Sequence, residues 1–159
     1  MTLIRTFEYV YYKMISIKRL NENDSDLCYE LDSNTISLWS KKQWTKEFKK
    51  EDTKIFALSL QNFVIGICVL QFVLDEAHIN FFVVNQKYRK RGFGTYFMNN
   101  LIKKCKKLSI NRLLLEVSQN NLIAEKFYKR FDFHTVGRRK NYYKDGSNAL
   151  LKEKKLTTK

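Results

Sequence analysis

Proline is absent from this 159-residue chain, glycine occurs only five times and cysteine three times. The cysteines, Cys28, Cys68 and Cys105, are scattered without a CxxC spacing. This argues against a zinc ribbon or a disulfide framework, so we expect buried, reduced thiols. His78 and His134 are the only histidines and belong to no metal-binding motif, so we predict no metal site.

A long hydrophobic run is also lacking. The longest apolar run covers residues 63–74 and contains Gly66 and Gln71, so it falls well short of the ~20 residues that a membrane span needs. The first residues have no apolar signal core and no small-residue cleavage site. We therefore expect a cytoplasmic protein without a membrane partner.

Acidic residues are scarce relative to basic ones, with 16 Asp and Glu against 30 Lys and Arg and a formal charge of +14. Such an excess favours polyanionic partners: RNA, the ribosome, DNA or a phosphate-rich cofactor. The lysines are spread along the whole chain, so a merely solvated surface is the alternative. The hydrophobic content of 44%, with 12 Phe and 9 Tyr, indicates a folded globule.

The first residues do not fit the pattern that follows them. Residues 1–13 lack the alternation that begins at Met14. We expect either a loosely held extension or an authentic start at Met14. Residues 14–159 are predicted to form a single domain, because no linker, repeat or proline interrupts them.

Apolar periodicity and turn residues predict one α/β layer structure with a mixed sheet. We expect Leu27 and Leu31 of the first helix to face inward, and the strand after the third helix to be buried on both faces. The expected order is a strand at 14–20, helices at 26–34 and 41–50, strands at 54–60, 63–74 and 77–84, a third helix, a strand at 111–118, a helix at 122–130, and strands at 133–138 and 149–156.

A glycine-bearing basic turn precedes the third helix, in the run Arg89-Lys90-Arg91-Gly92-Phe93-Gly94. The first turn of a helix has amides without an internal partner, which suit an anion. A basic turn before an ordinary helix is the alternative. The helix itself is amphipathic, and its spacing predicts one buried face made of Phe97, Leu101, Cys105 and Leu108.

Two residues further along could carry acid–base chemistry. Glu116 lies within an apolar strand, where a partly buried carboxylate could act as a general base. The alternative is a glutamate that reaches solvent or pairs with an arginine. Tyr128 lies between Phe127 and Phe131, which suits a core aromatic, but its phenol could also protonate a departing thiolate.

These motifs together resemble a known family. Arg-x-x-Gly-x-Gly is similar to the pyrophosphate loop of the GNAT N-acetyltransferases. The segments from Leu114 to Phe133 and from Arg139 to Tyr143 resemble the bacterial ribosomal-protein-alanine N-acetyltransferases (RimI), which have LEVR-x-SN-x-x-A-x-x-LY-x-x-LGF and RRNYY. Asp132 replaces the glycine of LGF, and a left-handed position there would tolerate aspartate.

The resemblance implies the GNAT fold: a mixed sheet of about seven strands with about four helices, splayed between strands 4 and 5. It implies Glu116 as general base and Tyr128 as general acid. It implies acetyl-CoA as co-substrate, and Trp39, Tyr142 and Tyr143 in acceptor recognition, although Trp39 could simply fill the core. The residues it assigns to the coenzyme are Phe82, Val83, Val84, Arg89, Lys90, Arg91, Gly92, Phe93, Gly94, Thr95 and Asn121.

The implied function is direct transfer of an acetyl group to a protein N-terminal α-amine, at the N-terminal alanine of a small-subunit ribosomal protein. Association with the ribosome would follow from such an acceptor. One alternative is a GNAT enzyme that acetylates another amine: a protein lysine, a polyamine or a small metabolite. Another is a non-catalytic GNAT-like module that binds RNA or the ribosome.

Overall fold

The computed structural model describes residues 14–156. The predicted extension, residues 1–13, lies outside the described residues. The chain forms two compact units, one of residues 14–69 and 81–100 and the other of residues 70–80 and 101–156. The single domain expected for residues 14–159 stays a prediction.

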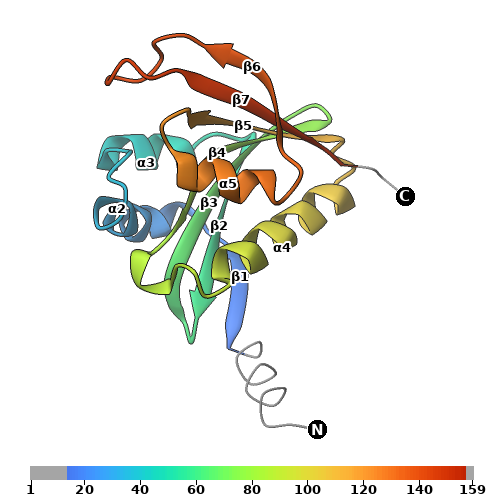
Figure 1. Ribbon diagram of the computed structural model, residues 1–159. Helices are drawn as coiled ribbons and strands as arrows, with labels where there is room; N and C mark the ends of the chain where they lie inside the picture. The colour runs from blue at the N-terminus through green and yellow to red at the C-terminus, as the bar shows by residue number, and fades with distance from the viewer. Residues whose placement is uncertain (1–13, 157–159) are drawn as a thin grey trace, which may run out of the picture. The chain divides into compact units, whose positions relative to one another are not determined.

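The observed elements follow the predicted order (Figure 1). They form a mixed seven-stranded sheet with the order β1-β2-β3-β4-β5-β7-β6, in which β4 and β5 are parallel. The elements are β1 (Ile15–Arg19), η1 (Glu22–Asp24), α2 (Ser25–Ser33), α3 (Lys41–Phe48), β2 (Thr53–Leu60), β3 (Phe63–Val73), β4 (Glu76–Val84), η2 (Gln86–Tyr88), α4 (Phe93–Lys107), β5 (Arg112–Ser118), α5 (Leu122–Lys129), β6 (His134–Arg139) and β7 (Ala149–Lys155).

In the first unit, α2 buries an aspartate where we expected a leucine. Leu27 is 39% exposed, so its predicted inward orientation is wrong, whereas Asp32 is fully buried. The Asp32 carboxylate accepts hydrogen bonds from the backbone N–H groups of Leu38 at 2.9 Å and Trp39 at 2.8 Å, and from the Trp44 indole N–H at 3.0 Å. These three donors satisfy the charge and fix the turn between α2 and α3.

The same turn places Trp39 in an aromatic cluster in the core of the first unit. Trp39 lies 4.8 Å from Trp44 and 5.0 Å from Phe81, centroid to centroid, and Trp44 is fully buried. Ser40 caps helix α3: its hydroxyl accepts from the Gln43 N–H while the Gln43 amide oxygen accepts from the Ser40 N–H. This capping box sets where Trp44 enters the core.

Gly66 of β3 lies where the backbone of β4 comes close. A Cβ at this position would stand 2.9 Å from the Val83 carbonyl oxygen and 3.3 Å from Val84 Cγ2. The first contact is with backbone, which cannot move aside as a flexible side chain can. Glycine at position 66 therefore permits the spacing of β3 and β4.

Replacing Gly66 with alanine should lower the free energy of unfolding by about 2 kcal/mol, because overpacking a tight site displaces backbone. Chemical denaturation monitored by circular dichroism measures this. Gly137→Ala is the matched control, since a Cβ there would meet only Leu151 side-chain atoms at 3.7 Å. Equal stability of the two variants would contradict the crowding at Gly66.

In the second unit, β5 has one fully buried face. Leu113, Leu115 and Val117 are buried, while Leu114 is partly buried and Glu116 reaches solvent. The prediction of burial on both faces is wrong for this reason. The parallel register runs from Glu76 opposite Arg112 to Ile79 opposite Leu115. Both strands continue past it, and their predicted splay stays a prediction.

Helix α4 ends one residue earlier than its apolar pattern suggested. Phe97, Leu101 and Cys105 are buried as predicted, but Leu108 is 50% exposed, so the prediction for Leu108 is wrong. Ser109 has a left-handed φ of 57°, which turns the chain out of the helix after Leu108. Cys28, Cys68 and Cys105 are all buried, which confirms their predicted burial.

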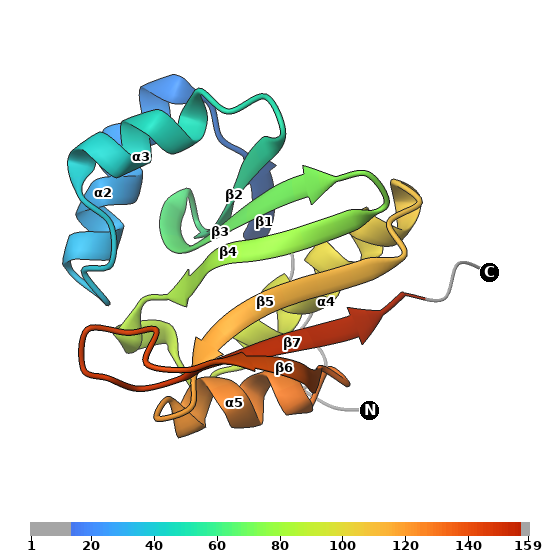
Figure 2. The same cartoon turned by 90° about the horizontal axis from the view of Figure 1, so that it is seen from above.

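The β6–β7 hairpin packs with α5 through a buried cation. The Lys152 ammonium donates to Glu125 Oε1 of α5 at 3.1 Å and to Thr135 Oγ1 of β6 at 3.0 Å. Asp132, between α5 and β6, has a φ of 60°, as predicted for the position of the family's glycine. Figure 2 shows β7 between β5 and β6, in agreement with the strand order.

Within residues 14–156, no helix combines the length and the apolar character that a membrane crossing requires.

Candidate functional site

The predicted anion loop opens α4 in the first unit. The Gly92 carbonyl accepts from the Tyr96 N–H at 2.9 Å, so the amides of Phe93 and Gly94 precede the first bond of the helix. Gly92 has a φ of 84°, which glycine adopts without strain, and a Cβ there would meet nothing within 4 Å. The loop thus offers open space in front of a helix N-terminus, where an anion is favoured.

Three cations precede this helix, and two of them are held by contacts within the unit. The Arg89 Nε–H donates to the Val84 carbonyl at 2.8 Å, which ties the loop to the end of β4. The Arg91 guanidinium lies 5.8 Å from the Tyr88 ring centroid and 5.4 Å from that of Phe93. Lys90 is exposed with a φ of 57°. The contacts of Arg89 and Arg91 thus hold positive charge beside the start of α4.

The strand assigned to the coenzyme leads directly into this loop. Val83 and Val84 are buried, and the Phe82 ring packs 5.4 Å from the Phe97 ring of α4. The predicted contact of this backbone with a coenzyme stays a prediction, as does the contact of Thr95.

In the second unit, Glu116 belongs to a compact polar cluster. Arg139 Nη2 and Glu116 Oε1 form an ion pair at 3.0 Å, and the Arg139 and Glu116 side chains are 53% and 31% exposed. The Arg139 guanidinium also lies 5.4 Å from the Tyr142 ring centroid, and the Tyr142 and Tyr143 rings meet edge to face at 5.3 Å. The arginine partner that we considered for Glu116 is therefore present, and Arg139 is a site residue that the sequence interpretation missed.

Tyr143 lies close enough to Glu116 to feel its charge. Partial burial raises the pKa of the Tyr143 phenol, and the neighbouring Glu116 carboxylate raises it further. Both effects keep the phenol protonated and neutral. Glu116, Arg139, Tyr142 and Tyr143 therefore make one connected cluster on β5, β6 and the loop after β6.

Side-chain bonds brace that loop against the end of β5. Ser118 Oγ and Ser147 Oγ lie 3.0 Å apart, and the Asn148 amide donates to Gln119 Oε1 at 3.0 Å. Asp145 accepts from both the N–H and the hydroxyl of Ser147, at 3.0 and 2.6 Å, which lowers the pKa of its carboxyl. The loop that carries Tyr142 and Tyr143 is thus fixed relative to Glu116.

The other two predicted residues of this unit lie on α5. Asn121 Oδ1 accepts from the Ala124 N–H at 3.1 Å and caps the helix, which engages this oxygen structurally. Tyr128 is buried, and its ring lies 5.5 Å from Phe127 and 5.6 Å from Phe133. These ring contacts are those of a core aromatic, and the acid role of Tyr128 stays a prediction.

The predicted residues are thus divided between the two units. The first unit holds the coenzyme strand and loop together with Trp39, whose ring contacts are those of the core alternative. The second holds Glu116, Asn121, Tyr128 and the tyrosine pair. Within each unit the structure brings neighbours together, and the convergence of the two sets stays a prediction.

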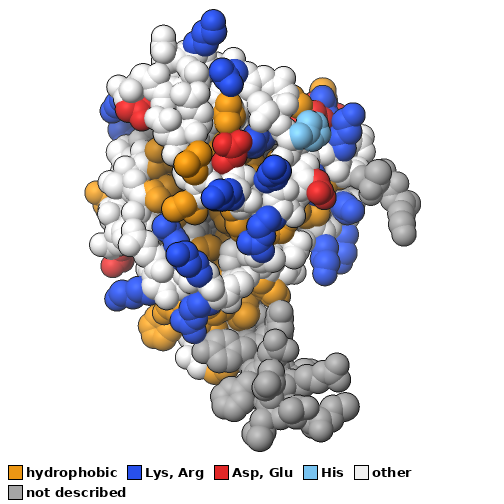
Figure 3. Space-filling model, in the orientation of Figure 1, with side chains coloured by type: hydrophobic (Ala, Val, Ile, Leu, Met, Phe, Trp, Pro, Cys, Tyr) orange, Lys and Arg blue, Asp and Glu red, His pale blue; other side chains and the backbone are white. Residues whose placement is uncertain are grey.

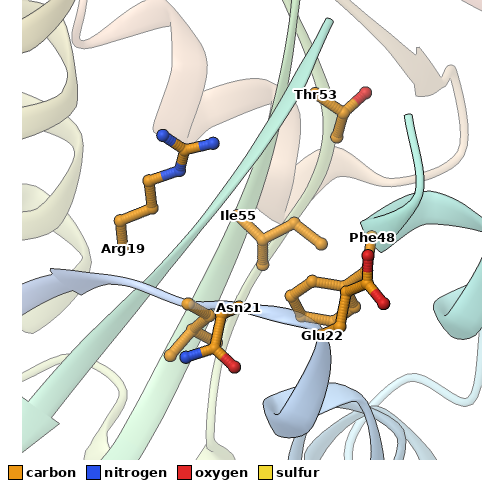
Figure 4. A pocket seen from close by; sticks show the side chains of 7 residues that line it. Arg19, Asn21, Glu22, Phe48, Thr53 and Ile55 are labelled. Carbon is orange, nitrogen blue, oxygen red and sulfur yellow. The ribbon is translucent and has the colours of Figure 1, made fainter. Parts of the chain in front are cut away.

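A pocket of about 360 Å³ lies elsewhere in the first unit (Figure 4). It is formed where β1 leads into η1, beside the end of α3 and the start of β2. Its lining residues are Arg19, Leu20, Asn21, Glu22, Phe48, Thr53 and Ile55. The predicted site residues are not among them, so the pocket lends no support to the predicted site.

Positive charge is prominent on the surface. Lysine and arginine side chains lie among hydrophobic and uncharged ones on the face shown in Figure 3, with few acidic side chains between them. Within the described residues, no group of three His, Cys, Asp or Glu side chains could hold a metal ion.

Comparisons with known proteins agree with these features. The model of the acetyltransferase (GNAT) family matches residues 20–133. A Bacillus subtilis protein is 28% identical over 139 residues, which are 86% of this chain and 92% of that protein. The [ribosomal protein bS18]-alanine N-acetyltransferase of Escherichia coli K12 is 28% identical over 131 residues, 82% of this chain and 88% of that protein. The crystal structure of the Escherichia coli ribosomal-protein-S18-alanine N-acetyltransferase superposes with a TM-score of 0.85 at 26% identity, over 92% of this chain and 96% of that one.

Proposed function

Because the chain belongs to the acetyltransferase (GNAT) family, we propose that it acetylates the N-terminal alanine of ribosomal protein bS18, with acetyl-CoA as the donor. One observation carries the proposal: the chain matches the Escherichia coli enzyme of that name over most of both lengths, in sequence and in fold. An acceptor of this kind implies action in the cytoplasm, where ribosomes are made.

The start of α4 fits the pyrophosphate of acetyl-CoA. Its helix N-terminus, the open space at Gly92 and the built-in charge of Arg89 and Arg91 suit two linked phosphates. Acetyl-CoA supplies the activated acetyl group as a thioester. The chain has to bind that group, orient it, accept a proton from the amine and donate one to the departing sulfur.

Glu116 takes the proton in this proposal. Its Oε1 is engaged by Arg139, so Oε2 is the oxygen left to receive a proton from the acceptor amine, directly or through a water. A carbon–nitrogen bond forms as the carbon–sulfur bond breaks, and the phenol of Tyr128 protonates the departing sulfur. The support for these roles is the motif match at both positions.

An α-amine suits a carboxylate base of ordinary strength. Its reference pKa of about 7.7–8.0 makes deprotonation at pH 7 cost roughly 1.0–1.4 kcal/mol, against roughly 4.6 kcal/mol for a lysine side chain. A single glutamate can offset the smaller cost. This comparison favours N-terminal over lysine acetylation.

Release of free CoA with an alanine-initiated bS18 peptide tests the proposal. We expect turnover with this peptide and little with the same peptide acetylated at its N-terminus. Preference for a lysine peptide, a polyamine or a small amine would assign another acceptor. Salt-sensitive RNA binding without any stabilisation by CoA would instead indicate a binding module.

A further inference from the structure

In the proposed function, the Glu116 carboxylate receives the proton of the acceptor amine. Arg139 already forms an ion pair with that carboxylate. It engages Glu116 Oε1 at 3.0 Å, and both side chains are partly exposed. An ion pair this accessible to water is worth little, so an incoming group can displace it. Arg139 keeps a second contact if it leaves, because its guanidinium already lies 5.4 Å from the Tyr142 ring centroid.

We propose that Arg139 is a specificity-determining residue that selects against amines that are almost entirely protonated at neutral pH. The inference rests on the proposed function, in which the acceptor amine reaches Glu116. Because Arg139 already balances the Glu116 charge, the cluster offers no net negative charge to attract an ammonium. An acceptor must then arrive as a neutral amine or displace Arg139.

The neighbouring loop does not restore a net negative charge. Asp145 is the only acidic residue between Arg139 and Ala149, and its carboxylate, which the Ser147 hydrogen bonds keep ionised, is outnumbered by two lysines. Lys140 and Lys144 are exposed on the same loop. The nearby Tyr143 phenol is kept neutral by burial and by Glu116 itself. The charges around Glu116 thus favour neutral over cationic acceptors.

Amine classes differ enough for this selection to matter. At pH 7 about one α-amine in ten is neutral, against about one lysine side chain in 2,500. An α-amine can therefore reach Glu116 through its neutral fraction, whereas polyamines and lysine peptides depend on a cation that must displace Arg139. Without Arg139, an uncompensated Glu116 would favour the cationic route, on which polyamines and lysine peptides depend.

Strand geometry supplies a matched control. Successive side chains of a strand point to opposite faces. Arg138 and Arg139 are neighbours on β6, opposite Leu150 and Ala149 of β7, and both are exposed. Arg138→Gln removes the same charge one residue away, and Glu116 pairs with Arg139, not with Arg138.

The test compares kcat/KM for an alanine-initiated peptide with kcat/KM for spermidine and for an N-terminally blocked lysine peptide. For Arg139→Gln we expect the ratio to shift about threefold to fivefold toward the cationic acceptors, the size of one partly exposed ion pair. Arg139→Lys should keep the wild-type ratio because it keeps the charge. Arg138→Gln should also keep it.

An unchanged ratio in Arg139→Gln, or an equal shift in Arg138→Gln, would overturn the assignment. Calorimetric titration measures the affinity for spermidine independently of turnover. We expect spermidine to bind threefold to fivefold more tightly to Arg139→Gln than to the wild type. If the wild type does not acetylate the alanine peptide, the proposed acceptor is wrong, while the titration still decides the role of Arg139.

Discussion

Replacing Glu116 with glutamine should lower kcat for the alanine peptide by about a hundredfold, the contribution of a single general base. Glutamine keeps the size of the side chain and its place on β5 but cannot accept the proton. Stability should change by less than about 1 kcal/mol, because the ion pair with Arg139 is partly exposed. Steady-state kinetics and thermal denaturation measure the two effects.

Arg139→Gln is the control for this result, since it breaks the same ion pair and leaves the Glu116 carboxylate in place. It should keep turnover with the alanine peptide within a few-fold of the wild type. Stabilisation by CoA should be equal in Glu116→Gln and the wild type. Full activity of Glu116→Gln at pH 7 would remove Glu116 from the role of base.

Replacing Asp32 with asparagine should lower the free energy of unfolding by about 3 kcal/mol. The fully buried carboxylate accepts three hydrogen bonds, and a bond to a charged acceptor contributes about 1.5–3 kcal/mol. Asparagine keeps one acceptor oxygen but turns an N–H₂ group either toward the Leu38 N–H or toward the N–H groups of Trp39 and Trp44. Urea denaturation with tryptophan fluorescence measures the loss directly.

Asp26→Asn is the matched control on the same helix. Asp26 is 74% exposed and pairs with Lys41 at 2.8 Å, so its loss should change stability by less than about 1 kcal/mol. A similar small change in Asp32→Asn would mean that the turn between α2 and α3 does not depend on its carboxylate acceptor.

The sequence predicted features that depend on neighbouring residues. The glycine loop before α4 and the left-handed Asp132 both follow from local backbone chemistry. The order of the strands along the chain could also be predicted, because apolar alternation and turn residues mark each strand separately.

Features that depend on distant partners were missed or predicted wrongly. Asp32 is buried because an indole and two backbone amides meet it, and nothing in the pattern of α2 announces those donors. Arg139 meets Glu116 only because β7 pairs with both β5 and β6. Apolar periodicity also predicted that Leu27 and Leu108 face inward. It considers neither where a helix ends, which matters for Leu108, nor a buried polar residue on the same helix, such as Asp32 beside Leu27.

The burial of Cys28, Cys68 and Cys105 has a practical consequence for spectroscopy. Burial raises the pKa of the Cys28 thiol to about 12, so very little reactive thiolate exists at neutral pH. A cysteine introduced at an exposed position such as Lys144 would outcompete the native thiols for a maleimide dye. The loop that carries Tyr142 and Tyr143 could therefore be followed by fluorescence during turnover without first removing the native cysteines.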